Sequence, residues 1–202
     1  MSVFLAILLA SAGDLPQNLQ DSEAPEPKTQ GFVRVRGGVW ASRGFDFEAV
    51  RSTGAQVSTS GEMLGSAALD FGVSIRERAL IFVSAEAGSG SGLDARVAGL
   101  YLGIRERIKP PYPPAMPHEI TAYAGALWGQ IEARDDAFGK FDDTWGFGGG
   151  LEFTWFLSRH WALSVIGEYR LMRFKYQEDV VSGETELGGS GAWAGASLEL
   201  RF

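Results

Sequence analysis

The last twelve residues of the chain alternate between two kinds of side chain. The even-numbered positions from Ala192 to Phe202 are small or apolar and end on an aromatic ring, whereas the odd-numbered positions include Glu199 and Arg201. Because successive side chains of a β-strand point to opposite faces, this segment predicts a strand with one apolar and one polar face. Such a strand has to lie between an apolar and a polar environment.

The same alternation recurs along the chain, with turn-forming or polar residues between the segments. The connections after every other segment are mostly longer or more polar, which is typical of an up-and-down barrel. A proline-rich link at residues 109–117 departs from this pattern, and proline cannot donate to a strand ladder. We therefore predict an all-β fold, an eight-stranded antiparallel up-and-down transmembrane β-barrel, with strands at residues 31–40, 63–75, 79–87, 93–104, 119–132, 144–157, 161–175 and 191–202.

Composition agrees with this fold. Mean hydropathy is −0.03, and beyond the N-terminus no apolar run approaches the roughly 20 residues that a spanning helix needs. A transmembrane barrel is compatible with these values, because only alternate residues face lipid. The net charge of −7 disfavours nucleic acid as a partner. Cysteine is absent, which excludes disulfides and thiol chemistry.

The first thirty residues predict a targeting segment and a leader. Residues 3–10 (VFLAILLA) form a short apolar run, and Ala10-Ser11-Ala12 supplies a small-residue cleavage box. We expect a signal peptide at residues 1–12, a flexible periplasmic leader at 13–30 and the barrel at 31–202. The leader is rich in proline and polar residues and cannot bury enough apolar surface to offset the entropy of ordering.

The polar faces of the strands predict a charged lumen. Eight strands enclose a space that side chains just fill, and buried charges are costly unless paired. Positive and negative charges nearly balance on these faces, so we expect a plugged, charge-paired interior, with the glycines at 146, 148 and 150 leaving room for long arginines. The residues predicted to form this lumen charge network are Arg34, Arg36, Asp70, Arg76, Arg105, Glu152, Glu168, Arg170, Glu199 and Arg201.

Two strands are harder to orient. In the fifth strand we expect Tyr123, Leu127 and Ile131 to face outward, with Gln130 and Glu132 inward. In the third strand, Leu80 and Phe82 share a face with Glu86, which is also a candidate for the lumen, so its inward face is ambiguous.

The chain resembles the OmpA-like eight-stranded outer-membrane β-barrel superfamily. The resemblance rests on the C-terminal ELRF strand, the GGGLEFTWFLSRHWALSVIGEYRL hairpin and the signal-like start. It implies integral residence in the bacterial outer membrane, contact with outer-membrane lipid and lipopolysaccharide, and insertion by the barrel-assembly machinery, with Phe202 as the insertion signal. At the loop end of the seventh strand, Arg173 and Lys175 follow outward Leu171 and are candidates for lipid A phosphate contacts.

The sequence leaves several functions open. We favour a structural or surface-interaction role for the barrel, carried by the acidic loops at 42–61, 133–143 and 177–188, because loops usually carry specificity. The alternatives are a narrow solute or ion pore, a soluble lipocalin-like ligand-binding barrel and, least favoured, a lipid A-modifying enzyme. His160, Ser164 and Glu168 share one face, but four-residue steps on a strand place them about 13 Å apart. We therefore expect no catalytic residues, cofactor or metal; the oligomeric state is not predicted.

Overall fold

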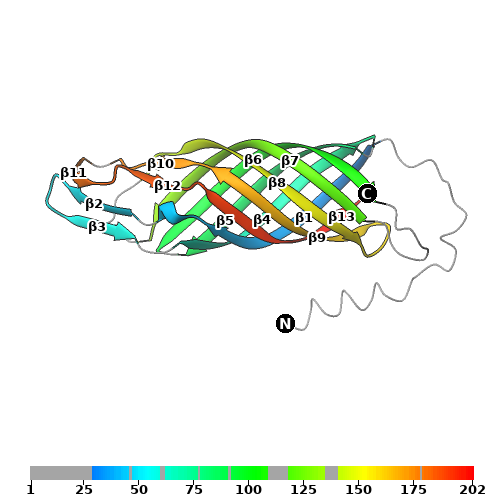
Figure 1. Ribbon diagram of the computed structural model, residues 1–202, viewed down its shortest axis with the longest axis horizontal. Coiled ribbons are helices and arrows are strands. Elements are labelled where there is room, and N and C mark those ends of the chain that lie inside the picture. Colours follow the sequence, from blue (N-terminus) through cyan, green and yellow to red (C-terminus); the bar gives the residue numbers. More distant parts are fainter. Residues whose placement is uncertain are drawn as a thin grey trace, which may run out of the picture.

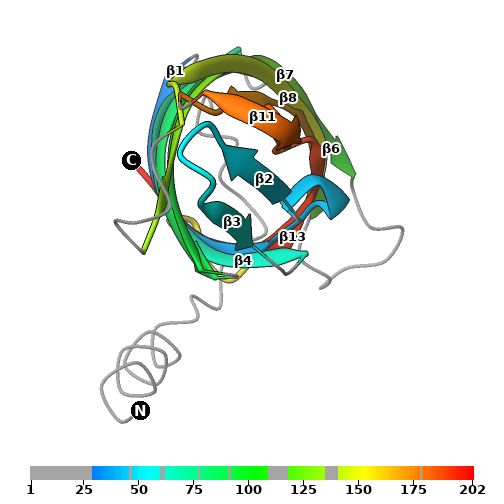
Figure 2. The same cartoon turned by 90° about the vertical axis from the view of Figure 1, so that its left-hand side faces the viewer.

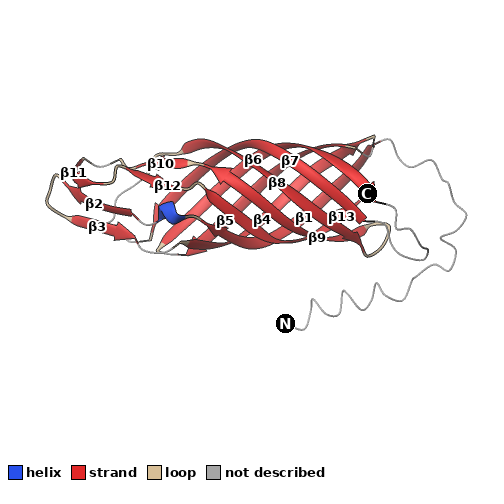
Figure 3. Ribbon diagram, in the orientation of Figure 1, coloured by secondary structure: helices blue, strands red, loops and turns tan. Residues whose placement is uncertain are grey.

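The computed structural model describes residues 29–45, 47–59, 62–76, 78–90, 92–108, 118–134, 141–177 and 179–202. Eight long strands form a closed antiparallel barrel, in the order β1-β13-β9-β8-β7-β6-β5-β4, and strands dominate the molecule (Figures 1 and 3). The predicted fold class is confirmed. The barrel strands are β1 (Thr29–Ala41), β4 (Met63–Ile75), β5 (Ala79–Gly90), β6 (Leu93–Ile108), β7 (His118–Ala133), β8 (Thr144–Phe156), β9 (Trp161–Leu171) and β13 (Gly191–Arg201).

Pairing of the first and last barrel strands closes the sheet. On β1, Arg34 lies opposite Glu199 of β13 on one side and opposite Asp70 of β4 on the other. Beyond β13, the backbone N–H and C=O of Phe202 both bond to Gly31, at 3.0 and 2.9 Å. Because every barrel strand has two neighbours, the barrel has no free sheet edge.

The outer surface of the barrel is an apolar belt. Ile104, Phe147 and Leu151 are 70%, 69% and 62% exposed although they are large and apolar. On β8, exposed Trp145 and Trp155 stand ten residues apart, about 33 Å along the strand. For strands tilted by about 40° this corresponds to a height of about 25 Å, the usual height of the lipid-facing band in outer-membrane barrels. Within the described residues, no helix is long and apolar enough to cross a membrane.

A folded cap covers the end of the barrel opposite the C-terminus (Figures 1 and 2). It contains a three-stranded sheet of β2 (Phe47–Arg51), β3 (Gln56–Thr59) and β11 (Val180–Gly183). A pair of short strands, β10 (Arg173–Lys175) and β12 (Glu186–Gly188), and the 3-10 helix η1 (Arg43–Phe45) complete it. Seen along the barrel axis, the three-stranded sheet lies within the outline of the barrel (Figure 2).

Aromatic side chains hold the cap together. Phe47 packs against Phe141 and Tyr176 with ring centroids 5.4 and 5.3 Å apart. These three rings are buried, as are Phe45 of η1 and Leu187 of β12. The cap therefore has an apolar core of its own directly above the lumen.

Strand β9 ends earlier than predicted. It stops at Leu171, because the Ser190 hydroxyl takes the place of a backbone partner at Met172: it accepts from the Met172 N–H at 3.1 Å and donates to the Met172 carbonyl at 3.0 Å. The chain then continues in nearly the same direction as β10.

The predicted orientation of β7 is wrong. Tyr123, Leu127 and Ile131 point inward and are buried, whereas Gln130 is half-buried and Glu132 is exposed on the outer face. The inward rings of Phe82, Tyr101 and Tyr123 pack together, with Phe82 stacked on Tyr101 at 4.7 Å. The lumen therefore contains an apolar layer as well as charges, and the middle of the lipid-facing side of β7 consists of Ala122, Ala124 and Ala126.

The structure also orients β5, since Leu80, Phe82 and Glu86 all face the lumen. The predicted signal peptide lies outside the described residues, as do nearly all of the predicted leader and the link at 109–117. Strand β1 begins at Thr29, two residues before the predicted start of the barrel.

Candidate functional site in the barrel lumen

The barrel interior holds five buried arginines and six buried carboxylates within the described residues. They come from all eight barrel strands, because alternation places one polar side chain after another on each inner face. The buried charged residues are Arg34, Arg36, Arg105, Arg170, Arg201, Asp70, Glu86, Glu119, Glu152, Glu168 and Glu199.

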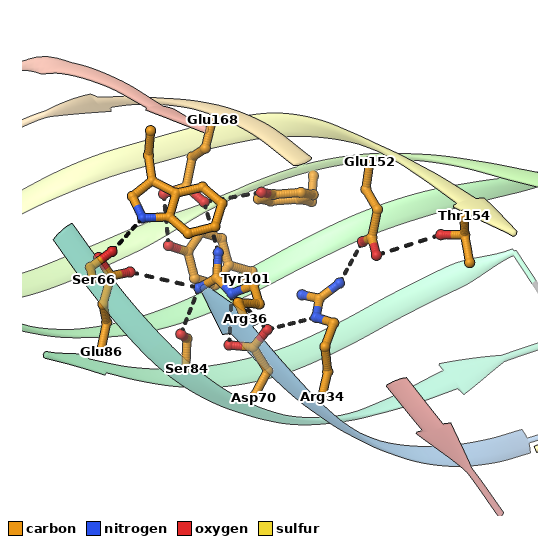
Figure 4. Close-up of polar contacts among 12 residues, drawn as sticks. Arg34, Arg36, Ser66, Asp70, Ser84, Glu86, Tyr101, Glu152, Thr154 and Glu168 are labelled. Carbon is orange, nitrogen blue, oxygen red and sulfur yellow. Dashed lines mark hydrogen bonds and ion pairs between the residues drawn. The ribbon is translucent and has the colours of Figure 1, made fainter. Parts of the chain in front are cut away.

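The charges nearer the cap form one cluster, here called the cap-side cluster, and Figure 4 labels its members Arg36, Asp70, Glu86 and Glu168. It consists of Arg36, Asp70, Glu86, Glu168 and Arg170, with Ser84, Tyr101 and Tyr123 as hydrogen-bonding partners. Arg170 donates from Nη1 and Nη2 to the two carboxylate oxygens of Glu86, at 2.9 and 2.7 Å. This two-pronged geometry is the strongest form of an arginine–carboxylate pair.

Glu168 connects the other members of the cap-side cluster. It accepts from Arg170 Nε at 2.8 Å and from the hydroxyls of Tyr101 and Tyr123 at 3.1 and 3.0 Å. Arg36 Nη1 lies 3.5 Å from it. Four donors around one buried carboxylate offset the cost of removing its charge from water.

Indole rings enclose the arginines from the cap side. The Arg170 guanidinium carbon lies 4.9 Å from the ring centroid of Trp40 and 5.8 Å from that of Trp193. Arg36 stands over Trp193 at 5.0 Å. These cation–π contacts place apolar surface directly against the buried charges.

The charges nearer the C-terminus form the second cluster: Arg34, Arg105, Glu119, Glu152, Glu199 and Arg201. Arg201 donates to Glu119 from Nη1 and Nη2 at 3.2 and 2.8 Å. Arg34 is paired with Glu152, and its Nε donates to Asp70 at 2.7 Å. Asp70 also pairs with Arg36 at 2.9 Å, so the two clusters form one continuous network.

Several of these pairs span the full width of the barrel. Arg170 on β9 and Glu86 on β5 lie on opposite strands of the eight-stranded ring, as do Arg105 on β6 and Glu199 on β13, 3.8 Å apart. An eight-stranded barrel is just wide enough to be filled by its own side chains. Pairing across the diameter therefore places charged groups in the middle of the lumen.

Nine of the ten residues predicted for the lumen network are buried inside the barrel. Arg76 is the exception and its assignment is wrong: it is exposed in the turn after β4, with a φ of 49°. Strand alternation ends where the chain turns, so the inward phase cannot be extended to this residue. Glu119 was missed because β7 was oriented the wrong way; the polar pair Glu119 and Thr121 on the face of Tyr123 was the available signal.

The glycines of β8 were expected to leave room for arginines, but the side chains next to Gly148 and Gly150 are Tyr123, Leu127 and Glu168. A Cβ on Gly150 would stand 2.9 Å from the Tyr123 hydroxyl, and one on Gly148 would stand 3.0 Å from Leu127 and 3.1 Å from Glu168. The glycines thus let the β7 side chains and Glu168 lie close to the wall.

The remaining predicted residues lie outside the lumen. Arg173 and Lys175 are exposed on β10, and Phe202 is 71% exposed on the outer face at the end nearest the termini. His160 lies exposed in the turn between β8 and β9, and the Ser164 hydroxyl shares a hydrogen bond of 2.9 Å with Thr154. His160 and Ser164 thus have separate environments, one at the surface and one in the lumen.

Comparison with known proteins supports the fold. No family model matches the sequence, and no curated protein does. The structure is similar to that of the outer membrane protein OprG from Pseudomonas aeruginosa, with a TM-score of 0.56, 13% identity, and coverage of 86% of this chain and 95% of OprG.

Two further solved structures are less similar. Neisserial surface protein A has a TM-score of 0.46 and 10% identity, over 87% of this chain and 97% of its own. Outer membrane protein AlkL, solved in DMPC bilayers, has a TM-score of 0.48 and 11% identity, over 93% of this chain and 97% of its own.

Long loops at one barrel end and short turns at the other are the pattern of outer-membrane barrels, in which the long loops are extracellular. The apolar belt requires lipid around the barrel, and the charged interior excludes a soluble barrel with an apolar pocket. The chain has the fold of small eight-stranded outer-membrane β-barrels, and its apolar outer belt is that of a membrane-spanning barrel.

Proposed function

We propose that this protein is a closed outer-membrane barrel that anchors a folded cap at the cell surface, with a structural or surface-interaction role rather than transport. The observation that carries the proposal is the pairing of Arg170 with Glu86 between opposite strands, at 2.7 and 2.9 Å. A solute path along the axis would require this pair to separate.

The energetics favour the closed state. Breaking a buried ion pair so that one charge is left without its partner costs about 3–5 kcal/mol. The network offers several such pairs at different heights, from Arg201–Glu119 to Arg170–Glu86. Above them, the buried rings of Trp40 and Phe45 form an apolar layer, with centroids 5.2 Å apart. Charged and apolar barriers are thus stacked along the axis.

The cap supports the second half of the proposal. The segments 42–62, 133–143 and 172–190 together carry eleven acidic and six basic residues. Glu48 and Glu184 are exposed on it, and the Glu184 N–H donates to the Glu48 carbonyl at 2.8 Å. Loops held by a rigid scaffold commonly carry recognition. A folded, acidic platform suits a partner surface of positive charge.

Planar-bilayer conductance tests the proposal. The wild-type barrel is compared with a variant in which residues 43–61 are replaced by a short glycine-serine turn, so that the sheet of the cap is lost and the lumen network is kept. We expect no steady current from either protein, since the ion pairs alone close the lumen.

Two results would contradict the proposal in different ways. Steady ohmic current through the wild-type barrel would show that it is a pore. Current through the variant without residues 43–61, but not through wild type, would show that the cap plugs the barrel. The main role of the cap would then not be interaction at the cell surface. Heat-modified mobility in gel electrophoresis confirms in both cases that the barrel is folded.

A further inference from the structure

The outward line of side chains on β9 continues beyond the apolar belt as two cations. Tyr169 and Leu171 are both 56% exposed on the lipid-facing side. After Leu171, the next two outward positions are Arg173 and Lys175, because Phe174 between them is fully buried. The inward side chains pack against β7: a Cβ on Gly129 would stand 2.5 Å from Met172 Cε and 3.3 Å from the Phe174 ring.

The register of β8 gives the height of these cations. Leu171 lies opposite Phe147, so two residues further along each strand Arg173 reaches the level of Trp145. The Asp142 N–H donates to the Lys175 carbonyl at 2.8 Å, which places Lys175 one step higher. Trp145 is 75% exposed at the cap-side edge of the belt, the level at which amphipathic rings meet lipid headgroups. Both cations therefore stand at the height of the outer-leaflet headgroups.

The Arg173 guanidinium is available to a ligand, and Lys175 is exposed opposite Glu186 of β12. Arg173 Nη1 lies 3.9 Å from Glu186, with side chains that are 80% and 53% exposed. An exposed pair at that separation contributes little. The β6–β7 side of the barrel differs: Arg134 is held by Asp94 at 3.1 Å, and exposed Glu132 lies directly opposite Asp94 in the strand pair.

We propose that Arg173 and Lys175 bind the phosphate groups of lipid A, with its acyl chains lying along Trp145, Phe147, Tyr169 and Leu171. A guanidinium binds a phosphate monoester through two parallel hydrogen bonds, and an ammonium adds a mobile charge. The apolar side chains directly below supply contact area for the chains. This site is on the outer wall, so it does not depend on whether the lumen conducts.

The experiment titrates purified barrel in phosphatidylcholine nanodiscs with bisphosphorylated lipid A and follows tryptophan fluorescence. Each cation near an anionic lipid surface contributes about fivefold, so Arg173→Ala/Lys175→Ala should weaken binding about thirtyfold. The conservative pair Arg173→Lys/Lys175→Arg should bind within a few-fold of wild type. Arg173→Gln/Lys175→Gln, which keeps side-chain length, should lose as much as the alanine pair.

The chain offers a closely matched control at the opposite end of the barrel. Arg78 is 79% exposed and lies 3.9 Å from Glu106, much as Arg173 does from Glu186, and Arg159 is a second exposed arginine in a turn. Arg78→Ala/Arg159→Ala removes the same charge, and its affinity for lipid A should equal that of wild type.

Three outcomes would overturn the proposal. One is unchanged affinity in both the alanine and the glutamine pairs, and another is an equal loss in the control. The third is wild-type binding of phosphatidylglycerol or dephosphorylated lipid A as tight as that of the bisphosphate, because the proposed contacts are made to lipid A phosphates.

Discussion

The pair of Arg170 and Glu86 offers a quantitative test of the lumen network. Arg170 is fully buried and donates three hydrogen bonds to carboxylates, two to Glu86 and one to Glu168, at 2.7–2.9 Å. Arg170→Met keeps an apolar side chain of similar length but removes all three. It leaves Glu86 with the Arg36 Nη2 at 4.0 Å.

The expected cost follows from this geometry. Leaving a buried carboxylate without its arginine costs about 3–5 kcal/mol of unfolding free energy. Glu86→Gln keeps hydrogen-bonding capacity and leaves Arg170 with Glu168, so we expect a smaller loss of about 1–3 kcal/mol. The double variant removes both charges together. Its loss should be smaller than the sum of the two single losses by about 2 kcal/mol.

Equilibrium unfolding in guanidinium chloride, followed by tryptophan fluorescence in phospholipid vesicles, measures these free energies. Refolding from denaturant has to retrace the unfolding curve for the values to be used. The pair does not hold the lumen together if the unfolding free energy of Arg170→Met lies within about 0.5 kcal/mol of that of wild type. The same conclusion follows if the losses of the two single variants simply add.

Three further predictions concern Gly150 in the barrel wall, Arg76 in the turn after β4, and Phe202. Gly150→Ala should cost about 1–3 kcal/mol of unfolding free energy, because its Cβ would collide with the backbone oxygen of Gly167 on the adjacent strand. Gly37→Ala, whose Cβ meets nothing within 4 Å, is the control in the same unfolding assay. The unfolding free energy of Arg76→Ala should lie within about 0.5 kcal/mol of that of wild type, whereas Arg34→Ala should lose several-fold more. Equal losses of unfolding free energy in the two variants would mean that burial in the lumen does not decide the effect. Phe202→Ala should lower the yield of barrel in the outer membrane of cells while purified barrel keeps nearly wild-type stability, since the ring is exposed and the strand bonds come from its backbone. A normal cellular yield of this variant would show that Phe202 is not the insertion signal.

Strand alternation was enough to predict the fold and much of the lumen. At residues 33–36, 150–153 and 198–202, charged or glycine positions alternate with large apolar ones, so the inner and outer faces differ in kind and the phase is evident. Arg34, Glu152 and Glu199 could be identified from this pattern alone. Which carboxylate each arginine meets depends on register and shear across the ring, which no single strand encodes.

The errors share a physical cause, because hydrophobicity does not distinguish a lipid-facing side chain from one in an apolar layer of the lumen. Tyr123 and Leu127 were placed outside for their apolar character, yet the outer face of β7 there consists of alanines, and the larger residues fill the lumen against Phe82. The cap could not be foreseen either. Its strands are four or five residues long in the main sheet, and they are ordered by contacts among Phe47, Phe141 and Tyr176, which are distant in sequence.

The most direct test of the closed lumen is solvent exchange of arginine guanidinium protons, measured by nuclear magnetic resonance on the barrel in lipid nanodiscs. Arg170 and Arg173 are three residues apart, one buried in the lumen and the other exposed on the outer wall. We expect the Arg170 Nη protons to exchange with water orders of magnitude more slowly than those of Arg173 and to show through-space contacts to Glu86. Equally fast exchange at both arginines, with no contact between Arg170 and Glu86, would mean that water fills the lumen and that the barrel is open.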